Sequence, residues 1–430
     1  MNIFTGAKPY VYFSNACIVI SACCIAISAV ATETQNDSTT SAFQPVDLDI
    51  HEYSAMDSDS QNDEHILSKP WYKNFELHGF AAIGFYDTGS AGTKENLVSE
   101  IKEASLFIEA DVWENTTFFI ELQTNRLGKD EEMFARTGEV YIHFREIPLN
   151  DSSSMGLKLG RIDIPFGEEY LWQDSIDNPL ISNSAAFPYG WDEGVLLYDQ
   201  YKKLHWILAV TDGTDARSKE DSSDKAVNLK LYGQPTPQLY LSVSAMRNGK
   251  SIKSALEFGG SHFEPVGTSN TSTVGSSESI AVDGFAYEFD LKAFFSDSVD
   301  GSYISFSLGA ANQQDDNSTF NRDFRWFSIE PLLRIGKDKY MVLRYSEVGT
   351  YDDNEGYHFD GKTTAGGNDS FGYDVKRFRR IGFGLGWIPN PRVKVKLEIG
   401  QDWFELIDQS PIRENDEDRS FFGLEVAVSF

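Results

Sequence analysis

The chain has 430 residues, and its 66 Asp and Glu outnumber its 37 Lys and Arg, which gives a formal net charge of −29. A chain this acidic is a poor candidate for nucleic-acid binding, because that binding depends mainly on neutralising phosphates. The three cysteines are Cys17, Cys23 and Cys24, so the later chain has no thiol for a disulfide or a cysteine metal site.

Residues Met1 to Ala31 have the layout of a secretory signal peptide. An apolar stretch runs from about Ala16 to Val30 and ends in small residues, so we predict cleavage after Ala31. The alternative is a lipoprotein signal ending at Cys23, which would cut the apolar stretch in its middle. Residues 32–70 are polar and acidic, and their composition predicts a disordered periplasmic arm.

From Phe75 onward the chain repeats runs of about ten residues with an apolar side chain at every second position. In Arg392 to Gly400, for example, apolar residues alternate with Lys394, Lys396 and Glu398. A period of two predicts a strand with one apolar and one polar face. The runs predict sixteen strands, near residues 75–87, 102–113, 117–126, 137–147, 155–163, 193–200, 204–211, 225–233, 238–247, 283–294, 301–311, 322–335, 339–350, 376–388, 391–405 and 419–430.

The predicted connections alternate in length. Short links rich in turn formers are expected at 114–116, 199–203, 234–237, 336–338 and 389–391. Long polar loops are expected around 88–101, 127–136, 164–192, 212–224, 248–282, 312–321, 351–375 and 406–418. Short periplasmic turns and long extracellular loops are typical of membrane barrels. We therefore predict that residues 71–430 form an all-β, antiparallel transmembrane β-barrel in the outer membrane of a Gram-negative bacterium, in contact with lipid and lipopolysaccharide.

The last eleven residues predict a closing strand. Its apolar residues share one face and resemble the assembly signal that bacterial barrels present to the barrel-assembly machinery; they are Phe422, Leu424, Val426, Val428 and Phe430. The alternative, an edge strand of a soluble sheet, would leave a long apolar edge that invites aggregation.

The segment Leu157-Lys158-Leu159-Gly160-Arg161-Ile162-Asp163-Ile164-Pro165-Phe166-Gly167 carries a family resemblance. It is similar to a strand, followed by Pro-Phe-Gly, in the sixteen-stranded porins related to phosphate-selective porins O and P, and the resemblance extends over about residues 72–430. It implies a homotrimeric porin whose third loop, here 165–192, folds inward and narrows the channel. The phosphate-selective members have an arginine-rich path to the anion site, which this loop lacks, and this speaks against specific phosphate capture.

Charged residues of the predicted loop and wall suggest a constriction. The loop region has six acids and no Lys or Arg; the acids are Glu168, Glu169, Asp174, Asp177, Asp192 and Glu193. Arg344, Lys394 and Lys396 alternate out of phase with apolar positions and are expected to face the lumen, while Arg145 and Lys158 are expected lower on another part of the wall. Opposed charges would create a transverse field that orients dipolar solutes. The alternative is that these charges only hydrate a polar lumen.

The expected function is passive diffusion of small polar or charged solutes, because sixteen strands leave an aqueous lumen. The alternative is a non-conducting structural or adhesive barrel that acts through its outer loops. None of the seven histidines lies in a metal or nucleophile motif, so no enzyme and no cofactor are predicted. Acid clusters at 352–355 and 414–418 are either solvated or share divalent cations with lipopolysaccharide.

Overall fold

The computed structural model describes residues 74–87, 97–125, 134–150, 153–172, 174–185, 188–213, 224–251, 257–258, 282–295, 301–315, 322–350, 357–360, 372–406 and 419–430. The chain divides into two units, 1–62 and 63–430. The predicted signal peptide, the alternative lipidation at Cys23 and the predicted arm lie outside the described residues, as do the acid clusters at 352–355 and 414–418.

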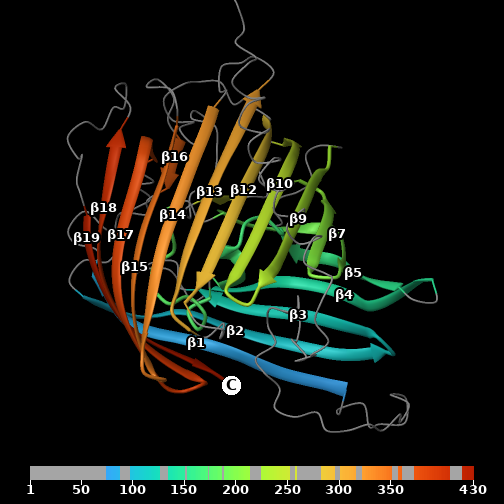
Figure 1. Ribbon diagram of the computed structural model, residues 1–430, viewed down its shortest axis with the longest axis horizontal. Coiled ribbons are helices and arrows are strands. Elements are labelled where there is room, and N and C mark those ends of the chain that lie inside the picture. Colours follow the sequence, from blue (N-terminus) through green and yellow to red (C-terminus); the bar gives the residue numbers. More distant parts are fainter. Residues whose placement is uncertain are drawn as a thin grey trace, which may run out of the picture. The chain divides into compact units, whose positions relative to one another are not determined.

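Sixteen long strands form one closed antiparallel sheet, so the predicted architecture and strand count are confirmed (Figure 1). The strands are β1 (Phe75–Asp87), β2 (Val98–Trp113), β3 (Thr116–Asn125), β4 (Phe134–Asn150), β5 (Ser153–Asp163), β7 (Trp191–Tyr201), β8 (Leu204–Thr211), β9 (Ala226–Thr236), β10 (Leu239–Ser251), β12 (Val282–Phe294), β13 (Tyr303–Asp315), β14 (Arg322–Ile335), β15 (Lys339–Thr350), β17 (Gly372–Asn390), β18 (Val393–Leu406) and β19 (Arg419–Ser429). Short strands β6 (Pro188–Tyr189) and β11 (Glu257–Phe258) pair with each other, and β16 (Tyr357–Asp360) pairs with β17.

The barrel closes where the first strand meets the last. β1 pairs with β2 on one side and with β19 on the other, with Phe80 opposite Ser429 and Phe85 opposite Leu424. The N–H of Phe430 donates to the carbonyl of Gly79 over 2.9 Å. Closure removes the open edge that would otherwise template pairing with another chain.

The outer face of the barrel is apolar. On β19, Phe422, Leu424, Val426 and Val428 are 37–40% exposed and alternate with buried residues. Exposed apolar side chains recur at alternate positions on the other strands, such as Val195, Val210 and Leu343. A closed barrel with an apolar outer surface satisfies every strand hydrogen bond within lipid, so it is a transmembrane β-barrel of the outer-membrane type. Within the described residues, no helix is both long and apolar enough to cross a membrane.

The inner face is polar over only part of the wall. Phe324, Trp326 and Phe378 are buried on this face and pack with Ile164 and Phe166, which follow β5. A second buried cluster surrounds Leu180 and includes Leu332, Tyr340 and Val342. The expectation of one apolar and one polar face per strand was therefore incomplete, because the chain between β5 and β7 packs against apolar residues of the inner wall.

Candidate functional site

The third-loop segment, residues 164–190 between β5 and β7, is the candidate site. It contains the short 3-10 helix η3 (Glu169–Trp172) and β6. Its described residues bond to side chains of β2, β9, β10, β15 and β18. These strands are spread around the closed sheet. The segment is therefore anchored to several separate parts of the wall.

A buried ion pair fixes the beginning of the third-loop segment. Nζ of Lys230 on β9 lies 2.8 Å from the Glu168 carboxylate and donates to the carbonyl of Gly167 over 2.5 Å. The hydroxyl of Tyr240 donates to Glu168 over 2.6 Å. The same Nζ lies 4.8 Å from the ring centroid of Tyr170. Burial, together with the negative charge of Glu168, raises the pKa of the Tyr170 hydroxyl well above its usual value.

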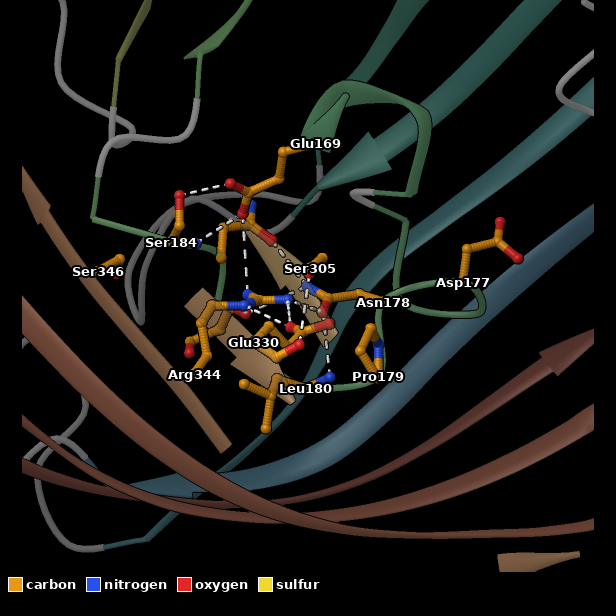
Figure 2. A network of polar contacts seen from close by, with 12 residues as sticks. Glu169, Asp177, Asn178, Pro179, Leu180, Ser184, Ser305, Glu330, Arg344 and Ser346 are labelled. Atoms are coloured by element: carbon orange, nitrogen blue, oxygen red, sulfur yellow. Dashed lines mark hydrogen bonds and ion pairs between the residues drawn. The ribbon is translucent and has the colours of Figure 1, made fainter. Parts of the chain in front are cut away.

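Arg344 on β15 bonds to several residues of the segment (Figure 2). Its guanidinium donates to Glu330 of β14 over 2.6 Å, to the carbonyl of Ser182 over 2.9 Å and to Oδ1 of Asn178 over 3.1 Å. The carboxylate of Glu169 lies 3.7 Å from the same guanidinium and accepts a 2.6 Å hydrogen bond from the N–H of Ser184. One arginine therefore joins two wall strands to three parts of the segment.

Glu398 and Lys396, both on β18, bond to residues 175–182 of the segment, which we call its tip. The Glu398 carboxylate accepts hydrogen bonds from the N–H groups of Ile181 at 2.6 Å and Ser182 at 2.8 Å. Nζ of Lys396 donates to the carbonyls of Ser175 at 2.7 Å and Leu180 at 2.9 Å. The Glu398 carboxylate accepts from backbone N–H groups, and the Lys396 ammonium donates to backbone carbonyls. The two side chains therefore satisfy backbone groups of the tip that a helix or sheet would otherwise pair.

The remaining charges at the tip come from the strands at the barrel seam, where β1 pairs with β19. Glu425 on β19 lies 2.6 Å from Lys396 and 3.6 Å from Lys102 of β2, and it accepts a 2.9 Å hydrogen bond from Tyr86 of β1. Lys102 also donates to the carbonyl of Ile181 over 2.8 Å. The tip is thus bonded to strands on both sides of the closure.

Glycines on the inner face of β17 and β19 make room for the tip. A Cβ atom at Gly384 would lie 2.4 Å from Cδ2 of Leu180, and one at Gly423 would lie 2.7 Å from Cδ1 of Ile181. Leu180 is 1% exposed. A larger residue at either glycine would force the side chain of Leu180 or Ile181 to shift.

The structure brings together part of the predicted set. Glu169 lies beside Arg344, and Nζ of Lys394 donates to the carbonyl of Asp177 over 3.2 Å. Asp177 is exposed, while the carbonyl of Asp174 accepts from the N–H of Asp177 in a turn. Glu169 and Asp177 of the segment thus contact wall cations directly, and the transverse field stays a prediction.

Four predicted residues make their contacts outside the segment, as expected for Lys158 and Arg145, which were predicted lower on another part of the wall. Asp192 belongs to β7, is buried and accepts from the N–H of Gly213 over 2.6 Å. Glu193 shares the outer face of β7 with Val195 and pairs with Arg161 at 2.7 Å, so its placement in the constriction was wrong; strand alternation turns it away from the lumen. The other two bond to residues outside the segment: Lys158 donates to Tyr141 over 3.1 Å, and Arg145 lies 3.6 Å from Asp111.

Sequence analysis did not single out Lys102, Lys230, Glu330 or Glu425, although each contributes to the anchoring. One signal was present in the closing strand, where Glu425 is the single charged residue between Ser420 and Phe430. Its position is out of phase with the outward apolar residues, so it had to face inward.

Comparisons with solved structures identify the class of fold. The outer-membrane channel DcaP of Acinetobacter baumannii matches with a TM-score of 0.54 and 12% identity over 83% of this chain and 97% of that one. The trimer form of the outer membrane protein OmpT of Vibrio cholerae gives 0.50 and 11% over 83% and 99%. OprB of Pseudomonas putida gives 0.50 and 10% over 84% and 95%.

The fold is therefore that of outer-membrane channel barrels. The identities are too low to carry more than the fold, and these matches do not establish the predicted relation to phosphate-selective porins. No protein-family model matches the sequence, and a search of curated proteins finds no match either.

Proposed function

We propose that the protein is an outer-membrane porin that allows passive diffusion of small polar or charged solutes through a lumen narrowed by the third-loop segment. The observation that carries the proposal is the anchoring of this segment to inner-face side chains of β2, β9, β15 and β18. A segment held at several points of a closed wall reduces the cross-section while the rest of the lumen stays open to water.

The proposed orientation follows from the connections. The third-loop segment leaves the barrel at the end where β13, β15 and β18 also end, and each of these strands is followed by a longer stretch of sequence before the next long strand. Residues 114–115, 202–203 and 391–392 connect strands at the opposite end. Membrane barrels place longer loops outside the cell and short turns in the periplasm. The end with the third-loop segment is thus the extracellular end in our proposal.

The charges along the path favour polar solutes. Carboxylates or backbone carbonyls of the protein bond to the cationic groups of Arg344, Lys396 and Lys230. Asp177 remains exposed on the segment, and Arg145 and Asp111 are 43% and 45% exposed on the wall. We propose a non-enzymatic passage without a cofactor, lined by charges of both signs.

We also propose a homotrimer, since OmpT of Vibrio cholerae has a trimer form. The closing strand with Phe422, Leu424, Val426, Val428 and Phe430 is proposed as the segment recognised by the barrel-assembly machinery. These residues face outward, where a partner protein or lipid reaches them.

A second candidate is a non-conducting structural or adhesive barrel. Its supporting observation is the burial of inner-face aromatic residues on the wall near the seam. Phe107 is 0% and Phe119 is 2% exposed, and their ring centroids lie 5.9 Å apart. A lumen in which such residues are covered on every side has less room for solute.

Swelling of liposomes that contain the purified barrel tests the proposal. Isotonic solutions of uncharged sugars of increasing size are applied, and the swelling rate is followed by light scattering. A water-filled lumen with a narrowing admits the smallest sugars, and the rate falls steeply with size. Absence of swelling with correctly folded protein would support the non-conducting alternative.

A further inference from the structure

Three cationic side chains of the inner face lie at the barrel end opposite the one from which the third-loop segment leaves. Lys292 is two residues before the end of β12, Arg334 is one residue before the end of β14, and Lys394 is the second residue of β18. Strand alternation places each of them in phase with buried inner-face residues. In the proposed orientation, this end is the periplasmic mouth of the lumen.

The ammonium of Lys292 is surrounded by aromatic rings. Its Nζ lies 4.0 Å from the ring centroid of Tyr303, 4.3 Å from that of Trp172 in η3 and 5.7 Å from that of Phe294. Within the residues that the structure describes, this half-buried ammonium has no hydrogen bond and no ion pair. Cation–π contacts attract the charge but give its three N–H donors no acceptor. An acceptor from the lumen can therefore still bind to Lys292.

Arg334 and Lys394 add positive charge to the same region. Lys394 donates to the carbonyl of Asp177, whose carboxylate is exposed on the tip and offsets part of the lysine charge. Cζ of Arg334 lies 5.4 Å from the ring centroid of Tyr340, and its Nε is buried without a hydrogen-bond partner among the described residues. Arg334 is close enough for its charge to act on both Lys292 and Lys394. An anion placed beside Arg334 would reduce this repulsion.

The carboxylates whose charges reach Lys292 are bonded to other cations. These carboxylates are Glu330 and Glu168. Glu330 lies 2.5 Å from Arg344, and Glu168 lies 2.8 Å from Lys230. Both acids are therefore occupied, and neither forms the direct ion pair that would close Lys292 to an anion from the lumen.

We propose that Lys292 and Arg334, with Trp172 beside them, bind aromatic monocarboxylates at the periplasmic mouth of the lumen. This inference deepens the proposed function, on which it rests, by naming a class of solute for the same lumen. The carboxylate accepts charge-assisted hydrogen bonds from the ammonium and the guanidinium. The aromatic ring of the solute packs against the half-buried indole of Trp172.

The surroundings of Lys292 favour this class over a small, strongly hydrated anion such as inorganic phosphate. Trp172, Phe294 and Tyr303 present ring faces to the ammonium, and Phe294 and Tyr303 are each 9% exposed. Burying a charged group is costly unless its hydrogen bonds are replaced, and the cost grows with its charge. Binding sites for small organic molecules combine an apolar lining with a few polar groups that fix the orientation. Lys292 and Arg334 supply those polar groups here.

Equilibrium binding of para-fluorobenzoate to the folded barrel in detergent tests this site, with the fluorine NMR line width as the readout. The test variant is Lys292→Gln/Arg334→Gln. The matched control is Lys202→Gln/Lys337→Gln, which removes two exposed cations from turns at the same end of the barrel. A third variant, Trp172→Leu, keeps both cations and removes the indole. Benzoate, acetate and inorganic phosphate serve as competitors.

We expect the Kd of para-fluorobenzoate to rise on the order of 10-fold in the test variant, because two charge-assisted contacts are lost. It is expected to rise less in Trp172→Leu and to stay near the wild-type value in the control. Benzoate is expected to displace the probe at lower concentration than acetate or phosphate. An unchanged Kd in the test variant or in Trp172→Leu, an equal rise in the control, or stronger competition by phosphate than by benzoate would overturn the proposal.

Single-channel conductance of the same preparations separates this inference from the porin function. A silent barrel that binds the probe contradicts only the porin function. A conducting barrel that does not bind the probe contradicts only the site at Lys292 and Arg334.

Discussion

Nζ of Lys396 lies 2.6 Å from the carboxylate of Glu425, and the two side chains are 1% and 0% exposed. Charges buried to this degree are stable only when they are paired and hydrogen-bonded. The remaining hydrogen bonds of Lys396 go to backbone carbonyls of the third-loop segment. The stability of the barrel seam and the position of the segment therefore depend on the same ion pair.

Replacing Lys396 with Met is expected to lower the free energy of unfolding by about 3 kcal/mol, because the buried charge of Glu425 then keeps only the more distant cation Lys102 and the hydroxyl of Tyr86 as partners. Urea unfolding in lipid vesicles measures the change. The double variant Lys396→Met/Glu425→Gln is expected to lose less than the single variant. Additive losses would mean that the two residues do not act as a pair.

Glu398→Gln is expected to release the tip of the third-loop segment. One carboxylate oxygen accepts from the N–H groups of Ile181 and Ser182, and the other accepts from the Ser182 hydroxyl. An amide has a single acceptor oxygen and cannot accept at both positions, which is expected to cost about 2 kcal/mol. Single-channel recordings are expected to show larger current fluctuations than the wild type. The control is Glu76→Gln, an exposed carboxylate on β1. Equal recordings from Glu398→Gln and the wild type would argue against a role of this contact in holding the segment.

Arg344→Lys tests whether the shape of the guanidinium matters beyond its charge. A lysine keeps the positive charge but cannot donate to Glu330, Ser182 and Asn178 at the same time. We expect proteinase K to cleave residues 174–185 faster than in the wild type while the strands stay protected. An unchanged cleavage rate would indicate that charge alone fixes the segment.

Gly384→Val is expected to displace Leu180, because a Cβ atom at this position would lie 2.4 Å from the leucine Cδ2. The double variant Gly384→Val/Leu180→Ala removes the clash and is expected to recover part of the lost stability. The measurement is the free energy of unfolding of the two variants and of Leu180→Ala alone. No recovery in the double variant would place the cost of the valine somewhere other than at Leu180.

Strand positions could be predicted because the period of two is a local property. The predicted bounds of β1, β8, β14 and β15 agree with the structure, and the other long strands differ mainly at their ends. Lipid requires an apolar residue at nearly every outward position, which makes the pattern strong. Part of the inner face is also apolar, as at Phe324 and Trp326 of β14, and the alternation did not predict this packing although it predicted the bounds of the strand.

The partners of the third-loop segment could not be predicted in the same way. Glu398 bonds to residues more than two hundred positions earlier in the chain, and a sequence pattern does not show which way a loop turns. Glu193 was counted with the acids of the loop region although it was the first residue of the predicted strand 193–200. In the structure β7 begins at Trp191, and alternation sends Glu193 outward. Strand alternation predicts that the side chain of Glu425 points inward, but it does not predict which residues the side chain contacts.

Single-channel conductance in a planar bilayer, recorded across a salt gradient, tests the central claim most directly. The wild-type barrel is expected to give discrete steps in groups of three, as a homotrimer requires, and Glu398→Gln and Arg344→Lys are expected to change the step size or the noise. A silent bilayer from correctly folded wild-type protein would contradict the account of a water-filled lumen narrowed by residues 164–190.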